Sequence, residues 1–138
     1  MSVFRYREVA APVRPHVGEA LEYVAREVSR DLGIDRKSFR IAWFVPDPDS
    51  DKWIDHPANP FYQGFALLDG TILLARHGTD EIWGLACTIC EIIPHELWHH
   101  HEHQHGMAPS EEDAKRYARA VSGPLWKAVY EILFEKRG

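Results

Sequence analysis

Apolar residues recur at every third or fourth position in the segment that follows Arg14, a spacing typical of one face of an α-helix. The segment RPHVGEALEYVAREVSRDLG carries them at Val17, Leu21, Val24, Val28 and Leu32. Gly33 comes directly after the last of them, where a glycine commonly ends a helix. The pattern predicts an amphipathic helix that covers a hydrophobic core.

The next part of the chain alternates between apolar and polar positions, which is the pattern of β-strands. One face of the run SFRIAWFV collects Phe39, Ile41, Trp43 and Val45. Two further apolar runs, FYQGFALL and TILLARH, are joined by Asp69-Gly70, a strong signal for a β-hairpin. A shorter run at residues 3–8 fits one more strand. The sequence therefore predicts a small antiparallel or mixed sheet of three to four strands.

A second helical pattern leads into a histidine-rich part of the chain. Thr79 is in the position of an N-cap, acidic residues follow it, and Leu85, Ile89 and Ile93 keep helical spacing. Pro94 interrupts the pattern, because proline has no backbone N–H and crowds the preceding turn. We expect the helix to kink or to restart at Pro94.

Helical signals return near the C-terminus. Ser110 fits an N-cap, with Asp113 at the capping-box position, and residues with small or apolar side chains follow at helical spacing. Gly123-Pro124 interrupts this pattern, so that the run LWKAVYEILFEK is expected to form a separate last helix. The predicted elements together indicate an α+β fold in a single domain, residues 1–138.

Composition and charge exclude some classes of partner. The chain has 138 residues, of which 45% are hydrophobic, enough for one domain with a core. Its formal net charge is −5 without a basic run, so neither nucleic acid nor an anionic membrane is an expected partner. No run is long and apolar enough to span a bilayer, and the N-terminus lacks the features of a secretory signal. We expect a cytoplasmic protein, with Cys87 and Cys90 acting as buried hydrophobic residues.

The stretch PHELWHHHEHQHG, residues 94–106, contains six of the nine histidines. Its first part is an HExxH motif formed by His95, Glu96 and His99. Four residues make about one helical turn, so both imidazoles can bind one zinc ion while Glu96 reaches a water molecule beside it. The motif predicts zinc, with His95 and His99 as ligands and Glu96 as the general base that activates the water.

A catalytic zinc site needs a third protein ligand. His103 lies on the same helix face, but at about 1.5 Å of rise per residue it is roughly 12 Å along the axis from His95. Glu111, in the first turn of the next predicted helix, lies on the same side as Ala114 and Ala118, whose small side chains would let two helices approach closely. Glu112 instead aligns with the basic residues of the solvent face, Lys115, Arg116 and Arg119. Glu111 is therefore the predicted third ligand.

His105 is the alternative third ligand. It completes the spacing H-E-x-x-H-x-x-x-x-x-H, which resembles the metzincins, zinc peptidases in which a midway glycine breaks the helix and returns the last histidine to the metal. Glu102, a good helix former, occupies the midway position in this chain, and Gly106 follows the histidine.

HELWH followed by EEDAKRYARAV resembles the gluzincins, in particular their short intracellular forms, the minigluzincins and the ImmA/IrrE-type peptidases. The resemblance covers roughly residues 60–122 and matches Glu111 and Ala114 to an E-x-x-A motif. It implies a zincin-like domain that hydrolyses peptide bonds, with zinc held by His95, His99 and Glu111. It also implies that the hairpin supplies an edge strand, expected at Thr71–Arg76, along which a peptide or protein substrate binds as an added strand.

Other functions fit the same histidines. In a non-catalytic metal-binding protein, the site would be structural or regulatory, and His100, His101, His103 and His105 would bind further metal ions. Alternatively, the histidines form a polar helix end that binds no metal. For the enzyme, the candidates that stabilise the oxyanion are His101, His103 and Tyr117.

Overall fold

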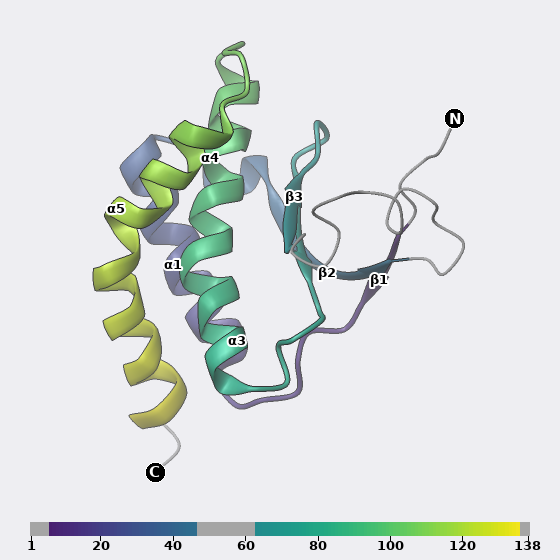
Figure 1. Ribbon diagram of the computed structural model, residues 1–138, viewed down its shortest axis with the longest axis vertical. Helices are drawn as coiled ribbons and strands as arrows, with labels where there is room; N and C mark the ends of the chain where they lie inside the picture. The colour runs from purple at the N-terminus through teal and green to yellow at the C-terminus, as the bar shows by residue number, and fades with distance from the viewer. Residues whose placement is uncertain (1–5, 47–62, 136–138) are drawn as a thin grey trace.

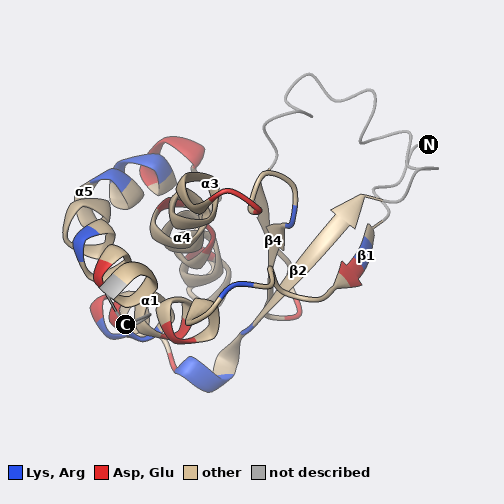
Figure 2. Cartoon of the chain, turned by 90° about the horizontal axis from the view of Figure 1, so that it is seen from below, with Lys and Arg blue, Asp and Glu red and all other residues tan. Residues whose placement is uncertain are grey.

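The sheet lies on one side of the molecule and the helices on the other (Figure 1). A computed structural model describes residues 6–46 and 63–135. The strands are β1 (Tyr6–Val9), β2 (Arg40–Pro46), β3 (Gly64–Ala66) and β4 (Thr71–Ala75), and the α-helices are α1 (Val17–Leu32), α3 (Ile82–Cys87), α4 (Ile93–Gln104) and α5 (Glu111–Tyr130). The view from below shows the same separation, with acidic and basic residues interspersed along α1 and α5 (Figure 2). The predicted α+β class is confirmed.

The sheet is mixed and its strand order is β1-β2-β4-β3. β1 pairs antiparallel with β2, β2 pairs parallel with β4, and β4 pairs antiparallel with β3. The predicted hairpin at Asp69-Gly70 joins β3 to β4: Gly70 has a φ of 94°, and the Asp69 side chain accepts a hydrogen bond from the Thr71 amide at 2.9 Å. β1 overlaps the strand expected at residues 3–8, of which the structure describes residues 6–8.

The expected edge strand, Thr71–Arg76, is not at an edge. β4 lies between β2 and β3, and its side chains are buried because apolar clusters cover both faces of the sheet there. The sequence pattern could not show this, since the β2–β4 pairing is a parallel contact between strands that are distant in the chain. β3 is the strand at the end of the sheet beside α4.

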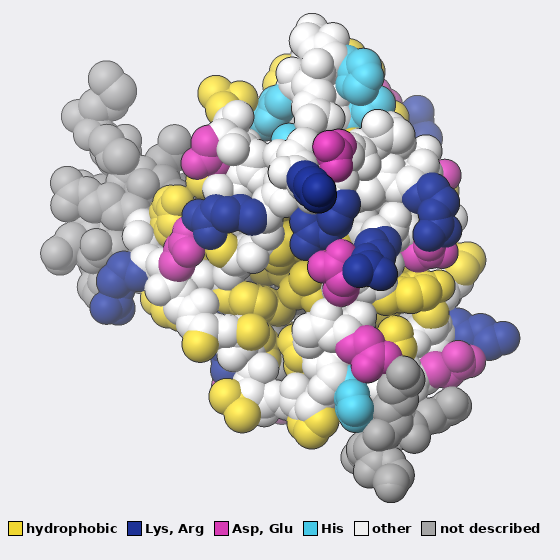
Figure 3. Space-filling model, turned by 180° about the vertical axis from the view of Figure 1, so that it is seen from behind, with side chains coloured by type: hydrophobic (Ala, Val, Ile, Leu, Met, Phe, Trp, Pro, Cys, Tyr) yellow, Lys and Arg dark blue, Asp and Glu magenta, His cyan; other side chains and the backbone are white. Residues whose placement is uncertain are grey.

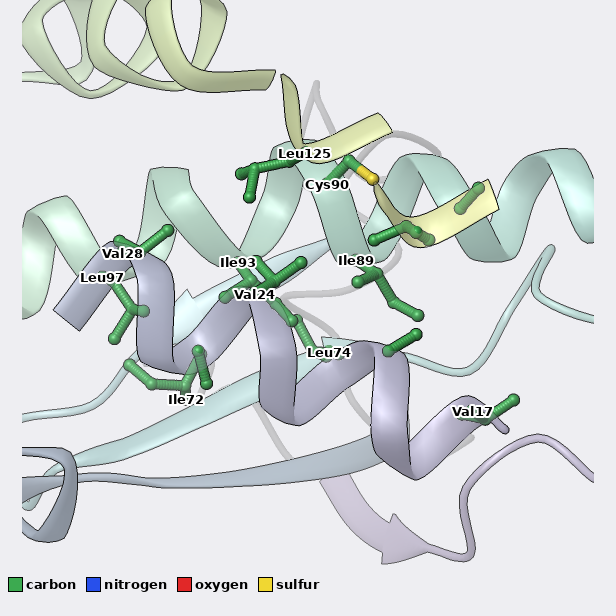
Figure 4. Packing of buried hydrophobic residues seen from close by; sticks show 14 of the residues in the cluster. Val17, Val24, Val28, Ile72, Leu74, Ile89, Cys90, Ile93, Leu97 and Leu125 are labelled. Atoms are coloured by element: carbon green, nitrogen blue, oxygen red, sulfur yellow. The ribbon is translucent and has the colours of Figure 1, made fainter. Parts of the chain in front are cut away.

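The core lies between the helices and one face of the sheet. Val24 and Val28 of α1 face Ile72 and Leu74 of β4, with α4 and α5 closing the cluster (Figure 4). Three of the residues predicted to share one face near β2 belong to this core: Phe39 and Trp43 are buried, and Ile41 packs against the cluster. Ala42 and Phe44 are buried on the other face of the sheet. Cys90 is also in the core, where burial raises the pKa of its thiol to about 12. The thiol therefore stays protonated, as expected of a buried hydrophobic residue.

The helix that carries the histidines begins later than predicted. Thr79 is not its N-cap, because the Thr79 hydroxyl donates to the Arg76 carbonyl at 2.6 Å and α3 starts at Ile82. Between α3 and α4, residues Thr88–Ile92 form a π-helical turn. The Ile93 amide closes this turn by donating to the Thr88 carbonyl, and the wider turn leaves room for the ring of Pro94, which comes next. The expected break at Pro94 is therefore a change of helix type within one continuous element.

The two helices predicted around Gly123-Pro124 are one. Ser110 caps α5 as predicted, accepting a hydrogen bond from the Asp113 amide at 3.1 Å. α5 then continues through Pro124 to Tyr130 and ends in a π turn, Glu131–Glu135. Leu125, Val129 and Leu133 beyond the proline are buried in the core, and this burial offsets the lost backbone hydrogen bond. Among residues 6–46 and 63–135, no helix combines the length and apolar character required to cross a membrane.

Candidate metal and catalytic site

A cleft of about 730 Å³ lies between β3, α4 and the first turns of α5. β3 forms one wall with residues 63–66, and α4 lines the floor with His95, Glu96, His99 and His103. α5 completes it with Glu111 and Lys115. Histidine side chains also reach the surface at the end of the molecule where α4 ends (Figure 3). The cleft therefore combines the HExxH residues with the start of the following helix.

His95, His99 and Glu111 come together in this cleft. Each offers one ligand atom, and the three atoms lie within 4.8 Å of one another. The His99 Nε2 is 2.7 Å from one Glu111 carboxylate oxygen, and the His95 Nε2 is 3.2 Å from the other. Donors about 2.1 Å from a tetrahedral zinc ion are about 3.4 Å apart, so two imidazole nitrogens and a carboxylate oxygen at these separations fit zinc after small movements.

His105 is outside this group. Its Nδ1 donates to the His101 carbonyl at 2.9 Å, and its ring packs against the His101 ring with centroids 4.4 Å apart. α4 stays helical through Glu102, the position at which a metzincin-like break would be needed, and ends only at Gln104. The structure thus brings Glu111, and not His105, to His95 and His99.

Glu96 faces the same cleft from a buried position. The residue is 7% exposed, and its carboxylate is 3.8 Å from the His95 Nε2. Burial raises the pKa of Glu96 to about 7, with a further contribution from the negative charge of Glu111 against the opposing effect of His99. A carboxyl group with this pKa can accept a proton and return it near neutral pH, which is what a general base requires.

Gly64 lets β3 pass close to Glu96. A Cβ atom at this position would lie 2.6 Å from the Ile92 Cγ2, 3.0 Å from the Glu96 Cγ and 3.1 Å from the Leu73 carbonyl oxygen. The first two atoms belong to side chains on the helix below, and the third belongs to the backbone of β4. Any side chain at residue 64 would therefore push β3 away from Ile92 and Glu96.

We expect Gly64→Ala to lower the unfolding free energy by about 1–3 kcal/mol, because the added methyl overpacks this contact. Urea unfolding of the variant measures the loss. Gly18→Ala is the matched control, since a Cβ there meets nothing within 4 Å and alanine is favoured within α1. Equal stability of Gly64→Ala and the parent protein would show that β3 does not need the glycine.

Glu102 is a functional candidate that the sequence analysis missed. It is 1% exposed, and it accepts hydrogen bonds from the His99 Nδ1 at 2.7 Å and from the Ser110 amide at 3.0 Å. A carboxylate can only accept hydrogen bonds, so His99 must carry a proton on Nδ1 to donate to Glu102. Its Nε2 then faces the cleft. Glu102 thus orients the His99 ring and, through the Ser110 amide, holds the start of the helix that carries Glu111. The sequence did indicate this pairing, because Glu102 comes three residues after His99 and so lies on the same side of the helix.

Burial and mutual interactions shift the pKa values of His95, His99 and Glu111. Burial works to lower the pKa of His99, but hydrogen bonds to Glu102 and Glu111 outweigh it and raise this pKa above its ordinary value. Burial also lowers the pKa of His95, against the effect of Glu111. For Glu111, burial works to raise the pKa, and the two histidines outweigh it and lower the pKa. Glu111 is therefore a carboxylate at neutral pH, as a metal ligand must be.

Two of the three oxyanion candidates are engaged elsewhere. The Tyr117 hydroxyl donates to Asp31 at 2.7 Å, and its ring stacks on Trp98. His101 packs against Trp98 and His105 and does not line the cleft. His103 does line the cleft. Its Nδ1 is buried without a hydrogen-bond partner among the described residues, which favours the proton on Nε2 since a buried N–H is rarely left unpaired.

No protein-family model, curated protein or solved structure matches the chain. The likeness to the gluzincins therefore rests on the motifs HELWH and EEDAKRYARAV and on the geometry of the residues that they place in the cleft.

Proposed function

We propose that this protein is a zinc-dependent peptidase with a zincin-like fold, in which His95, His99 and Glu111 bind the metal and Glu96 is the general base. The observation that carries the proposal is the convergence of all four side chains on one cleft, with three potential ligand atoms within 4.8 Å. Their chemistry suits zinc, which commonly takes two histidines and one carboxylate at catalytic sites.

A zinc ion at this position supplies Lewis acidity toward water and toward the carbonyl oxygen of a peptide bond. Glu96 takes the proton of the attacking water, and its raised pKa allows it to pass the same proton to the leaving amine. Glu102 keeps the His99 ring in the orientation that presents Nε2. β3, at the end of the sheet, takes the place of Thr71–Arg76 as the strand beside which an extended substrate binds.

The proposal is tested by zinc content and peptide hydrolysis in the same preparation. We expect one zinc per chain by elemental analysis, cleavage of unstructured peptides, loss of cleavage after chelation, and its recovery on adding zinc back. Two or more tightly held ions per chain, with no cleavage, would favour the non-catalytic metal-binding protein. No retained zinc would contradict both functions.

Glu102→Gln is expected to weaken zinc binding by about 10–100-fold, the usual effect of removing a carboxylate that orients a histidine ligand. Competition with a chromogenic chelator measures the affinity. Glu112→Gln is the control, because Glu112 is on the exposed face of α5 and pairs with Arg116. If Glu102→Gln binds zinc as tightly as the parent protein does, Glu102 does not position His99.

If His103 donates a hydrogen bond to the developing oxyanion, His103→Gln is expected to lower kcat by about 10²-fold with little change in KM, because such a bond acts chiefly in the transition state. His101→Gln, a change two residues before His103 at a position outside the cleft lining, is the comparison. Equal kcat values for His103→Gln and the parent enzyme would exclude His103 from this role.

A further inference from the structure

Lys115 has a different environment from the other basic residues of α5. It is exposed, as the sequence predicted for Lys115, Arg116 and Arg119, and it also lines the cleft, one helical turn after Glu111. Arg116 pairs with Glu112 at 3.2 Å and with Asp113 at 3.5 Å. Among the described residues, no carboxylate lies within ion-pair distance of Lys115. Lys115 thus brings an uncompensated positive charge to the cleft.

The two carboxylates in the cleft do not pair with the Lys115 ammonium. The carboxylate of Glu111 is engaged by His95 and His99, and that of Glu96 is buried beneath β3. The opposite wall, residues 63–66, contains no charged side chain. An anionic group on a bound ligand is therefore the available partner for the Lys115 ammonium.

Charge in the cleft also differs from charge in the whole chain. The formal net charge of the protein is −5. Among the groups that line the cleft, a bound zinc ion and Lys115 would together carry more positive charge than Glu96 and Glu111 carry negative charge. Positive potential in a cleft of an otherwise acidic protein attracts anionic ligands and repels cationic ones.

We propose that Lys115 forms a carboxylate-binding subsite, so that the cleft selects peptides with a carboxylate next to the scissile bond. This inference rests on the proposed peptidase function. The carboxylate is the side chain of an Asp or Glu residue, or the free C-terminus when the last peptide bond is cut. Both present the same group to Lys115, at a position beside His95 and Glu111.

Peptide pairs test the preference and identify its source. One pair differs by Asp or Asn beside the cleaved bond, and the other by a free or an amidated C-terminus. We expect the parent enzyme to favour the charged member of one pair by about fivefold in kcat/KM, the size of a single solvent-accessible ion pair. Lys115→Gln should remove this preference, Lys115→Glu should reverse it, and Arg116→Gln should leave it unchanged. A parent enzyme with no preference, or a preference that survives Lys115→Gln, would overturn the subsite.

A binding measurement separates this inference from the proposed function. Succinic acid monohydroxamate and butyrohydroxamic acid have similar lengths and the same zinc-binding group, but only the first has a carboxylate. We expect the first to bind the zinc-loaded protein about fivefold more tightly, and Lys115→Gln to abolish the difference. Equal binding of the two would overturn the subsite alone. Failure of both to bind zinc-loaded protein would overturn the proposed function and the subsite with it.

Discussion

Glu96→Gln is expected to lower the kcat for peptide hydrolysis by about 10²–10⁴-fold while one zinc per chain is retained. Glutamine has nearly the same shape as glutamate but cannot take a proton from water. Glu96 itself is not among the three clustered ligand atoms, so its replacement leaves the metal-binding group intact. The measurement is kcat on a fluorogenic peptide, with zinc content determined on the same sample.

Two further variants test whether the loss of cleavage is due to the loss of the general base. Glu112→Gln removes an exposed carboxylate from α5, outside the cleft lining, and should cleave at the parent rate. His99→Ala should lose both zinc and cleavage, which distinguishes loss of the metal from loss of the base. Parent-like cleavage by zinc-loaded Glu96→Gln would contradict the proposed role of Glu96.

In metal-free protein, the same Glu96→Gln change is expected to increase stability at alkaline pH. Burial raises the pKa of folded Glu96 from 4.5 to about 7, so folding favours the protonated carboxyl. The stability that this contributes is fully present below pH 4.5 and is lost as the pH rises through 7. The difference between the two pKa values corresponds to about 3 kcal/mol of unfolding free energy. Glutamine, which is neutral throughout, avoids this loss.

Urea unfolding of chelator-treated protein from pH 5 to pH 8.5 measures this effect. The advantage of Glu96→Gln over the parent protein should grow with pH and approach about 3 kcal/mol at the upper end. Glu112→Gln, which removes an exposed carboxylate paired with Arg116, is the comparison for the loss of one negative charge. Parallel pH profiles for Glu96→Gln and the parent protein would show that Glu96 does not titrate near neutral pH.

Sequence patterns predicted the features that depend on short-range spacing. The periodicity of α1, the glycine that ends it and the Asp69-Gly70 hairpin are each specified within a few residues, and all three are present. The meeting of Glu111 with His95 and His99 was also expected, because Ala114 and Ala118, which are buried, marked the close-packed side of α5. Its role as a ligand remains part of the proposal.

The features that depend on tertiary contacts were not predictable in this way. The position of β4 inside the sheet depends on its parallel contact with β2, and nothing in the local pattern of Thr71–Arg76 indicates that contact. The continuity of α5 through Pro124 depends on core burial beyond it, which overrides a local signal for a break. Glu102 was overlooked because its value as a partner of His99 depends on burial, which follows from the docking of α5 on α4.

The π turn at Thr88–Ile92 makes the length of this segment as important as its side chains. If the same residues formed regular α-helix instead, the wider turn would be lost and everything that follows would rotate by roughly 100° relative to α3. His95, Glu96 and His99 would turn together, away from β3 and Glu111, although each of them was unchanged. Natural variants of this protein that keep the cleft should therefore either keep the π turn or lose it together with one residue of this segment.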